Sequence, residues 1–160
     1  MSENGILVVV SGFAGAGKGT LMKNLISRYE NYSLSVSATS RSPRPGEEDG
    51  VSYFFKTREE FEEMIRNDAF LEYAEYVGNY YGTPRDFVEK MLSEGKRVVL
   101  EIEIQGAFQI KRKYPQALLL YVMPPSAEEL MRRIKGRGTE SADVINSDRS
   151  PLNLDIPPYS

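Results

Sequence analysis

The sequence predicts an α/β fold with a parallel sheet flanked by helices, and three observations lead to this prediction. The β-branched run Ile6–Val10 has the continuous apolar character of a strand that is buried on both faces. A glycine-rich segment follows it, and residues 21–29 then carry apolar side chains at helical spacing. Two more apolar runs, 98–104 and 117–123, alternate with helical patterns, as expected for successive βα units.

Composition limits the class of protein. The chain has 160 residues, of which 41% are hydrophobic and 27% are charged, and these values are typical of one globular domain with at most a small subdomain. The sequence shows neither a basic leader nor an apolar run long enough to span a membrane, so we expect a cytoplasmic protein with no membrane partner. The net charge of −3 argues against a nucleic-acid partner.

The absence of cysteine and histidine limits the chemistry. Disulfides, zinc sites, thiol nucleophiles and Ser–His pairs cannot be built from this chain. Any metal ion must therefore be a hard cation held by oxygen atoms and by substrate phosphates.

The first part of the chain is expected to form a βα unit that leads into a proline-rich loop. A second strand is expected at Tyr32–Val36, and residues 40–46 must form a loop because they contain two prolines and a glycine. The apolar residues that share one face of the first helix are Leu21, Met22, Leu25, Ile26 and Tyr29.

Residues 37–83 are interpreted as a small mixed α/β insert. Val51–Lys56 and Phe70–Val77 have the pattern of short strands. Between them, Thr57 and Glu60 have the spacing of a capping box that starts a helix. The buried face of this helix should contain Phe61, Met64 and Ile65.

The alternation of strands and helices resumes after the insert. Thr83 and Pro84 should start a helix that ends before Gly95, and Ser126 and Glu129 have the spacing of a second capping box. The inward residues of these two helices should be Phe87, Val88, Met91 and Leu92 in the first, and Leu130, Met131 and Ile134 in the second.

The glycine-rich segment has the chemistry of a phosphate-binding loop, or P-loop. It fits G-x-x-x-x-G-K, except that Gly19 stands where a serine or threonine usually offers a hydroxyl to Mg²⁺, with Thr20 one position later. Glycines let the backbone N–H groups point inward, and the helix N-terminus and Lys18 add positive potential. The alternative, a flexible loop with chance glycines, is disfavoured by the order of strand, loop and helix. The residues expected to bind nucleotide phosphates, which the resemblance described below assigns to ATP, are Gly12, Phe13, Ala14, Gly15, Ala16, Gly17, Lys18, Gly19 and Thr20.

The P-loop sequence GFAGAGKGT is one part of a larger set of motifs. The other parts are the segments 37–47, 70–83, 98–106 and 132–140. Over about residues 5–147 this pattern resembles the guanylate kinases, which are P-loop nucleoside monophosphate kinases. The resemblance implies a P-loop NTPase-type core with a GMP-binding insert and a lid. It also implies phosphoryl transfer from ATP to GMP with Mg²⁺ as cofactor.

In the segment 37–47, the resemblance assigns the acceptor phosphate to two arginines. Arg41 and Arg44, three positions apart on a proline-stiffened loop, can bind one phosphate as planar forks, and Tyr53 can donate a further hydrogen bond. Glu47 belongs to the same GMP-binding segment. A solvated basic loop is the ordinary alternative for such residues.

In the segment 70–83, the resemblance assigns guanine recognition to Glu72. Guanine presents adjacent N1–H and N2–H₂ donors that one carboxylate can accept, whereas adenine presents an acceptor at N1. Ser37 and Thr83 are expected near the base, and Tyr81 near the phosphate. Without the resemblance, Glu72 would be read as a surface residue and Tyr81 as a packing residue.

The segment 98–106 delivers acids at the end of an apolar strand, where a P-loop fold places the acid that organises Mg²⁺. Glu101 fits this position and is also assigned to the GMP site, and Mg²⁺ is expected to contact Thr20 and Glu101 through water. Glu103 stands where the family usually has the shorter Asp, and its role is open.

The basic segment 132–140 resembles the family's lid, so Arg133 and Arg137 inherit contacts to the transferring phosphoryl group. With Lys18 they form the expected catalytic set. A basic cluster that complements a helix dipole is the ordinary explanation, and both roles are compatible.

The resemblance ends at about residue 147. Asp148 stands where the family has a third lid arginine, and Pro151 discourages a continuing helix. Residues 148–160 therefore form an atypical tail, and the final strand and helix of the family are expected to be missing.

The predicted organisation is a P-loop core, a GMP-binding subdomain, a lid region and the tail. Their residues are, in that order, 1–36 with 84–125, 37–83, 126–147 and 148–160. The predicted activity is guanylate kinase-type phosphoryl transfer. Two alternatives are a nucleotide-binding pseudo-enzyme or interaction module with impaired catalysis, and another small-molecule P-loop kinase. The oligomeric state cannot be read from the sequence.

Overall fold

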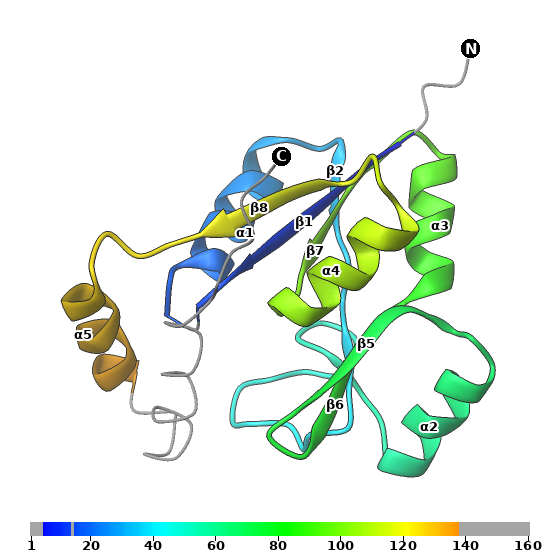
Figure 1. The fold of residues 1–160 in the computed structure, drawn as a ribbon, viewed down its shortest axis with the longest axis horizontal. Coiled ribbons are helices and arrows are strands. Elements are labelled where there is room, and N and C mark those ends of the chain that lie inside the picture. The colour runs from blue at the N-terminus through cyan, green and yellow to red at the C-terminus, as the bar shows by residue number, and fades with distance from the viewer. Residues whose placement is uncertain (1–4, 14, 138–160) are drawn as a thin grey trace.

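A four-stranded parallel sheet forms the centre of the protein (Figure 1). The structure is a computed structural model, and it describes residues 5–13 and 15–137. The strands lie in the order β2-β7-β1-β8. Their bounds are Ile6–Gly12 for β1, Tyr32–Leu34 for β2, Arg97–Glu101 for β7 and Leu118–Val122 for β8.

Helices cover both faces of this sheet because β1 is apolar on both sides. Leu7 and Val9 pack with residues of α3 (Arg85–Ser93) and α4 (Ile104–Lys113). Val8 and Val10 point to the other face and pack with Met22 of α1 (Lys18–Arg28). The last described helix, α5 (Ala127–Arg137), lies to one side of the sheet (Figure 1).

A second, mixed sheet has the strand order β4-β3-β6-β5. The bounds are Ala38–Thr39 for β3, Phe54–Phe55 for β4, Phe70–Tyr76 for β5 and Asn79–Pro84 for β6, with helix α2 at Arg58–Arg66. Phe61 of α2 is fully buried and stacks on Phe70 and Tyr80, at ring-centroid distances of 4.4 and 5.2 Å. The capping box is confirmed, since Glu60 N donates to Thr57 Oγ1 and Thr57 N donates to Glu60 Oε2.

Several predicted boundaries are wrong. The run 98–104 is not one strand, because β7 ends at Glu101 and α4 begins at Ile104, in a segment where no helix was expected. The strand β6 was also missed. It contains Thr83 and Pro84, which were expected to start a helix, and α3 begins only at Arg85. The predicted strands 32–36 and 51–56 shrink to β2 and β4.

Three residues that were expected to face inward are exposed. Leu21 and Phe87 lie next to the buried residues of their helices, Met22 and Val88, and Tyr29 lies beyond the end of α1. The exposed fractions are 48% for Leu21, 55% for Tyr29 and 40% for Phe87. At the second capping-box pattern, Glu129 N donates to Ser126 Oγ at 3.1 Å, but the Glu129 carboxylate bonds Arg132 and Arg133 of its own helix instead.

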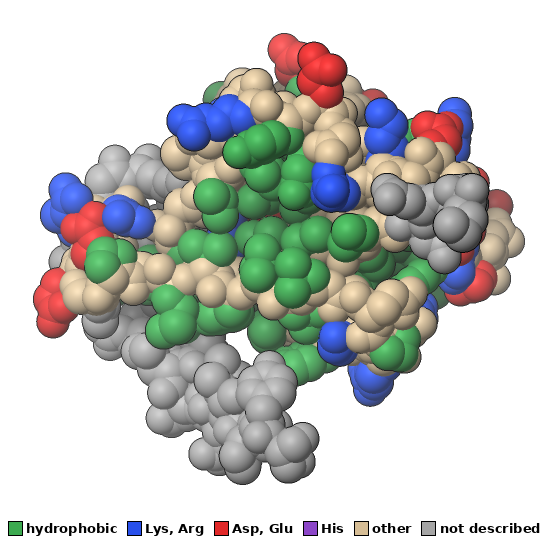
Figure 2. Space-filling model, turned by 90° about the horizontal axis from the view of Figure 1, so that it is seen from above, with side chains coloured by type: hydrophobic (Ala, Val, Ile, Leu, Met, Phe, Trp, Pro, Cys, Tyr) green, Lys and Arg blue, Asp and Glu red, His purple; other side chains and the backbone are tan. Residues whose placement is uncertain are grey.

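Among the described strands, β8 lies at an edge of the first sheet and exposes the apolar side chains of Leu118 and Leu120, and Met123 directly after it is also exposed. Hydrophobic side chains gather on the face shown in Figure 2. No helix within the described residues is long and apolar enough to cross a membrane. The predicted lid residues 138–147 and the tail 148–160 lie outside the described residues.

Candidate functional site

The glycine-rich segment joins the end of β1 to the start of α1, as predicted. Gly12 has φ 147°, and a Cβ there would collide with the backbone carbonyl oxygen of Val122 in the neighbouring strand β8. Gly17 caps α1 in the left-handed region with φ 101°. Both positions require glycine, and together they bring the loop backbone back over the N-terminus of α1, where unpaired N–H groups favour anions.

Lys18 lies at this loop. Its Nζ donates to the carbonyl oxygens of Gly12 at 2.6 Å and Phe13 at 3.1 Å, so the ammonium group is held by the backbone of the loop. A hollow of about 830 Å³ opens beside it, and Gly15, Gly17, Thr20 and Arg133 are among the residues that line it. The position Ala14, predicted to bind ATP, lies outside the described residues.

Arg133 of α5 reaches this loop from the other side of the hollow. Its Nη1 donates to the carbonyl oxygen of Ala16 at 3.3 Å, and its Nε donates to Glu129 Oε1 at 2.6 Å. Hydrogen bonds from Arg132 and Arg133 lower the pKa of the Glu129 carboxyl to about 2. Glu129 therefore aims Arg133 at the P-loop, a role that the spacing of four residues within a helix could have suggested. The side chain of Arg137 lies outside the description.

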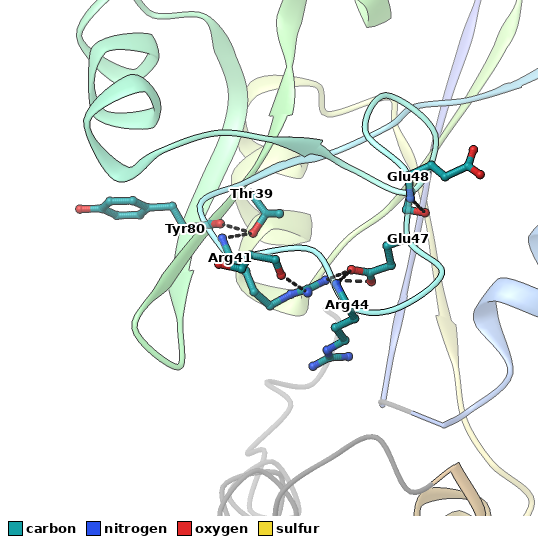
Figure 3. Close-up of polar contacts among 8 residues, drawn as sticks. Thr39, Arg41, Arg44, Glu47, Glu48 and Tyr80 are labelled. Atoms are coloured by element: carbon teal, nitrogen blue, oxygen red, sulfur yellow. Dashed lines mark hydrogen bonds and ion pairs between the residues drawn. The ribbon is translucent and has the colours of Figure 1, made fainter.

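Arg41 is fixed by Glu47 in the loop after β3 (Figure 3). Arg41 Nη2 donates to both carboxylate oxygens at 2.9 and 3.0 Å, and the backbone N–H of Arg44 donates to Oε2 at 2.7 Å. Burial alone would raise the pKa of Glu47, but these hydrogen bonds lower it. The guanidinium of Arg44 extends away from the pair and is exposed. Glu47 thus holds both arginine positions of the loop.

Two tyrosines complete this cluster. The guanidinium of Arg41 lies 5.5 Å from the ring centroid of Tyr53, and the rings of Tyr53 and Tyr81 meet edge to face at 6.1 Å. Burial and the neighbouring Tyr81 raise the pKa of the Tyr53 hydroxyl, and the charge of Glu101 acts in the same direction. The hydroxyl therefore stays a hydrogen-bond donor at neutral pH. The structure brings Arg41, Tyr53 and Tyr81 together, with Glu101 at the end of β7 close enough to act on Tyr53.

Glu72 is a buried acid on β5, 4% exposed. It pairs across the strands with Thr83 of β6, whose Oγ1 donates to Glu72 Oε1 at 2.6 Å. Burial raises the pKa of Glu72 to about 6, although Thr83 and the positive charge of Lys113 oppose the rise. Ser37 directly precedes β3, whose register pairs Ala38 with Gly82, so Ser37 lies on the Thr83 side of the second sheet.

The donor set for a metal ion is incomplete in the protein itself. Within the described residues no group of three or more acidic side chains could hold a metal ion. Thr20 lines the hollow, and Glu101 ends β7, the neighbour of β1. A hydroxyl and a carboxylate are suitable ligands for Mg²⁺, directly or through water, provided that nucleotide phosphates and water complete the octahedron.

Comparison with known proteins identifies the family. The sequence model of the family described as guanylate kinase matches residues 4–157. The guanylate kinase of Bacillus anthracis is 58% identical over 147 residues, which are 91% of this chain and 72% of that protein. The guanylate kinase of Lactococcus lactis subsp. lactis is 56% identical over 92% of this chain and 72% of its own.

Solved structures give the same result. The crystal structure of guanylate kinase from Anaplasma phagocytophilum superimposes with a TM-score of 0.73 at 37% identity, covering 86% of this chain and 70% of that one. The expected α/β fold with a parallel sheet flanked by helices is therefore confirmed. The chain belongs to the guanylate kinase family.

Proposed function

We propose that this chain transfers the γ-phosphoryl group of Mg-ATP to GMP and releases ADP and GDP. The observation that carries the proposal is the buried carboxylate of Glu72, which pairs with Thr83 on the same strand β6 that carries Tyr81 of the arginine–tyrosine cluster. The cluster fits a monophosphate, Glu72 fits guanine, and the P-loop fits a triphosphate. Relatives named guanylate kinase at 54–58% identity support the same assignment.

The P-loop binds the donor nucleotide. Its backbone N–H groups and Lys18 surround the ATP phosphates, because Lys18 is already held at the loop by two carbonyl oxygens and can exchange them for phosphate oxygens. Thr20 and Glu101 would hold Mg²⁺ through water, and the bound ion would neutralise part of the phosphate charge.

The insert binds the acceptor. Arg41 and Arg44 bind the GMP phosphate, and Tyr53 and Tyr81 donate hydrogen bonds to it. Glu47 holds the guanidinium of Arg41 by two hydrogen bonds, so less side-chain freedom is lost when the phosphate binds. The ionised carboxylate of Glu72 accepts hydrogen bonds from N1–H and N2–H₂ of guanine, with Ser37 and Thr83 beside the base.

Catalysis requires positioning and charge stabilisation more than a base. A GMP phosphate oxygen attacks the γ-phosphorus in line, and charge spreads over the equatorial oxygens in the transition state. Lys18 of the P-loop and Arg133 of α5 stabilise this charge, and we assign the same role to Arg137. We also propose that the lid region 126–147 and the subdomain 37–83 close on the core 1–36 and 84–125, which excludes water and limits ATP hydrolysis.

A coupled assay of ADP formation tests the proposal. With ATP and Mg²⁺ present, GMP should drive turnover while AMP, CMP and UMP at equal concentration should not. An equal response to the four acceptors, or none to GMP, would contradict the assignment. GMP binding by calorimetry without turnover would indicate a binding protein instead.

A further inference from the structure

Helix α4 contacts β5 on both sides of Glu72. Gln109 Nε2 donates to the carbonyl oxygen of Tyr73 at 2.7 Å, and the N–H of Tyr73 donates back to Gln109 Oε1 at 3.4 Å. Lys113 Nζ donates to the carbonyl oxygen of Leu71 at 2.7 Å. In the described part of the second sheet β5 is an edge strand, so the Gln109 amide takes the place of a neighbouring strand at Tyr73.

Gly106 lies on the same face of α4, three residues before Gln109, and faces Glu72 itself. A Cβ at this position would overlap Glu72 Oε2 and would lie 2.9 Å from Glu72 Cδ and 3.3 Å from Ile102 Cδ1. The backbone of Gly106 is helical, with no positive φ that would require glycine. Helix propensity favours alanine over glycine here. Position 106 is thus glycine because the Glu72 carboxylate occupies the space that a side chain would need.

We infer that Gly106 and Gln109 are positioning residues for base recognition. Gly106 leaves the volume in which the Glu72 carboxylate lies, and Gln109 fixes the strand that carries it. The inference rests on the proposed function, in which Glu72 binds guanine. Two hydrogen bonds to N1–H and N2–H₂ require one defined orientation of the carboxylate plane. A methyl group at position 106 displaces the end of a flexible side chain, so it changes the site more than the fold.

The test compares Gly106→Ala and Gln109→Ala with Arg112→Ala, an exposed residue of the same helix, as the matched control. Gly106→Ala should raise KM for GMP about tenfold, because a factor of this size corresponds to the loss of one hydrogen bond to a charged group. KM for ATP should be unchanged. The preference for GMP over AMP should fall, whereas Tm should stay the same or rise. Gln109→Ala should act in the same direction, and Arg112→Ala should match the parent chain.

A double-mutant cycle with Glu72→Asp separates positioning from general damage. The aspartate carboxylate is one methylene shorter and does not reach the added methyl, so Gly106→Ala should have little further effect in the Glu72→Asp background. An unchanged KM for GMP in Gly106→Ala, or equal effects in both backgrounds, would overturn the inference. The comparison of the two backgrounds tests the inference even when Gly106→Ala lowers Tm.

A readout without turnover keeps the inference distinct from the proposed function. If the parent chain neither binds nor phosphorylates GMP, the proposed function fails. The pKa of Glu72, followed by carbon-13 NMR of its carboxyl, still tests the contact with Gly106. Gly106→Ala should shift this pKa and Arg112→Ala should not, and an unshifted pKa in Gly106→Ala would overturn the inference.

Discussion

Replacement of Glu72 by glutamine should stabilise the nucleotide-free fold while it weakens GMP binding. Burial raises the pKa of Glu72 from its ordinary value of 4.5 to about 6. The folded chain therefore holds this proton more tightly than the unfolded chain. The stability that the protonated carboxyl provides is present below about pH 4.5 and is lost as the pH rises through 6. This rise in pKa corresponds to about 2 kcal/mol.

The glutamine amide can still accept the hydrogen bond from Thr83, but it has no charge to desolvate. At pH 7.5 the variant should gain at most about 2 kcal/mol in free energy of unfolding, because the amide N–H₂ must itself be desolvated. Urea unfolding between pH 4.5 and 8, without nucleotide, measures this change. Glu75→Gln is the matched control, because Glu75 is an exposed acid on the same strand and should differ from the parent by less than about 0.5 kcal/mol.

The same variant should bind GMP at least about tenfold more weakly, because the amide N–H₂ would face a guanine donor. Calorimetric titration measures the affinity, and the AMP titration reports the loss of discrimination. The reasoning is refuted if Glu72→Gln is less stable than the parent at pH 7.5, or if both chains depend on pH in the same way. Unchanged GMP affinity would remove Glu72 from the guanine site.

Three further substitutions test separate parts of the molecule. Lys18→Ala should abolish phosphoryl transfer in the coupled assay yet leave GMP affinity by calorimetry unchanged, because Lys18 serves the donor side; retained turnover would contradict the site. Glu47→Gln should raise KM for GMP several-fold without changing KM for ATP, because it weakens the support of Arg41; equal changes in both constants would point to general damage. Thr57→Ala removes half of the capping box of α2 and no residue assigned to either nucleotide, so urea unfolding should show a loss of about 1 kcal/mol with unchanged steady-state constants.

The features that the sequence predicts well are local ones. The P-loop and the Thr57 capping box depend on residues within a few positions of one another, so spacing alone reveals them. The strand β6 depends instead on its pairing with β5 through the turn at Val77 and Gly78, whose φ angles are both positive. The strand contains a glycine and a proline, which are uncommon within strands, so the sequence pattern does not predict it.

In the candidate site, too, the sequence predicts local groupings and not long-range contacts. Arg41 and Glu47 are six residues apart, and the motif that contains them predicted their grouping. By contrast, Gln109 bonds Tyr73 from 36 residues away, and helix α4, which carries it, was not predicted at all. The clash that a side chain at Gly106 would make with Glu72 depends on this long-range packing. Only the folded chain reveals it.

The strand order explains how the two halves of the reaction meet. β7, β1 and β8 are consecutive neighbours in the parallel sheet, and Val10 of β1 pairs with Glu101 of β7. The P-loop thus begins next to the acid that influences Tyr53, since adjacent strands lie only about 4.8 Å apart. On the other side of β1, the segment after β8 leads to α5 and Arg133, which reaches the P-loop at Ala16. Parallel strands end at one edge of a sheet, where α/β proteins bind ligands. The groups that we propose for the acceptor, for the donor and for charge stabilisation therefore follow one another in the order of β7, β1 and β8.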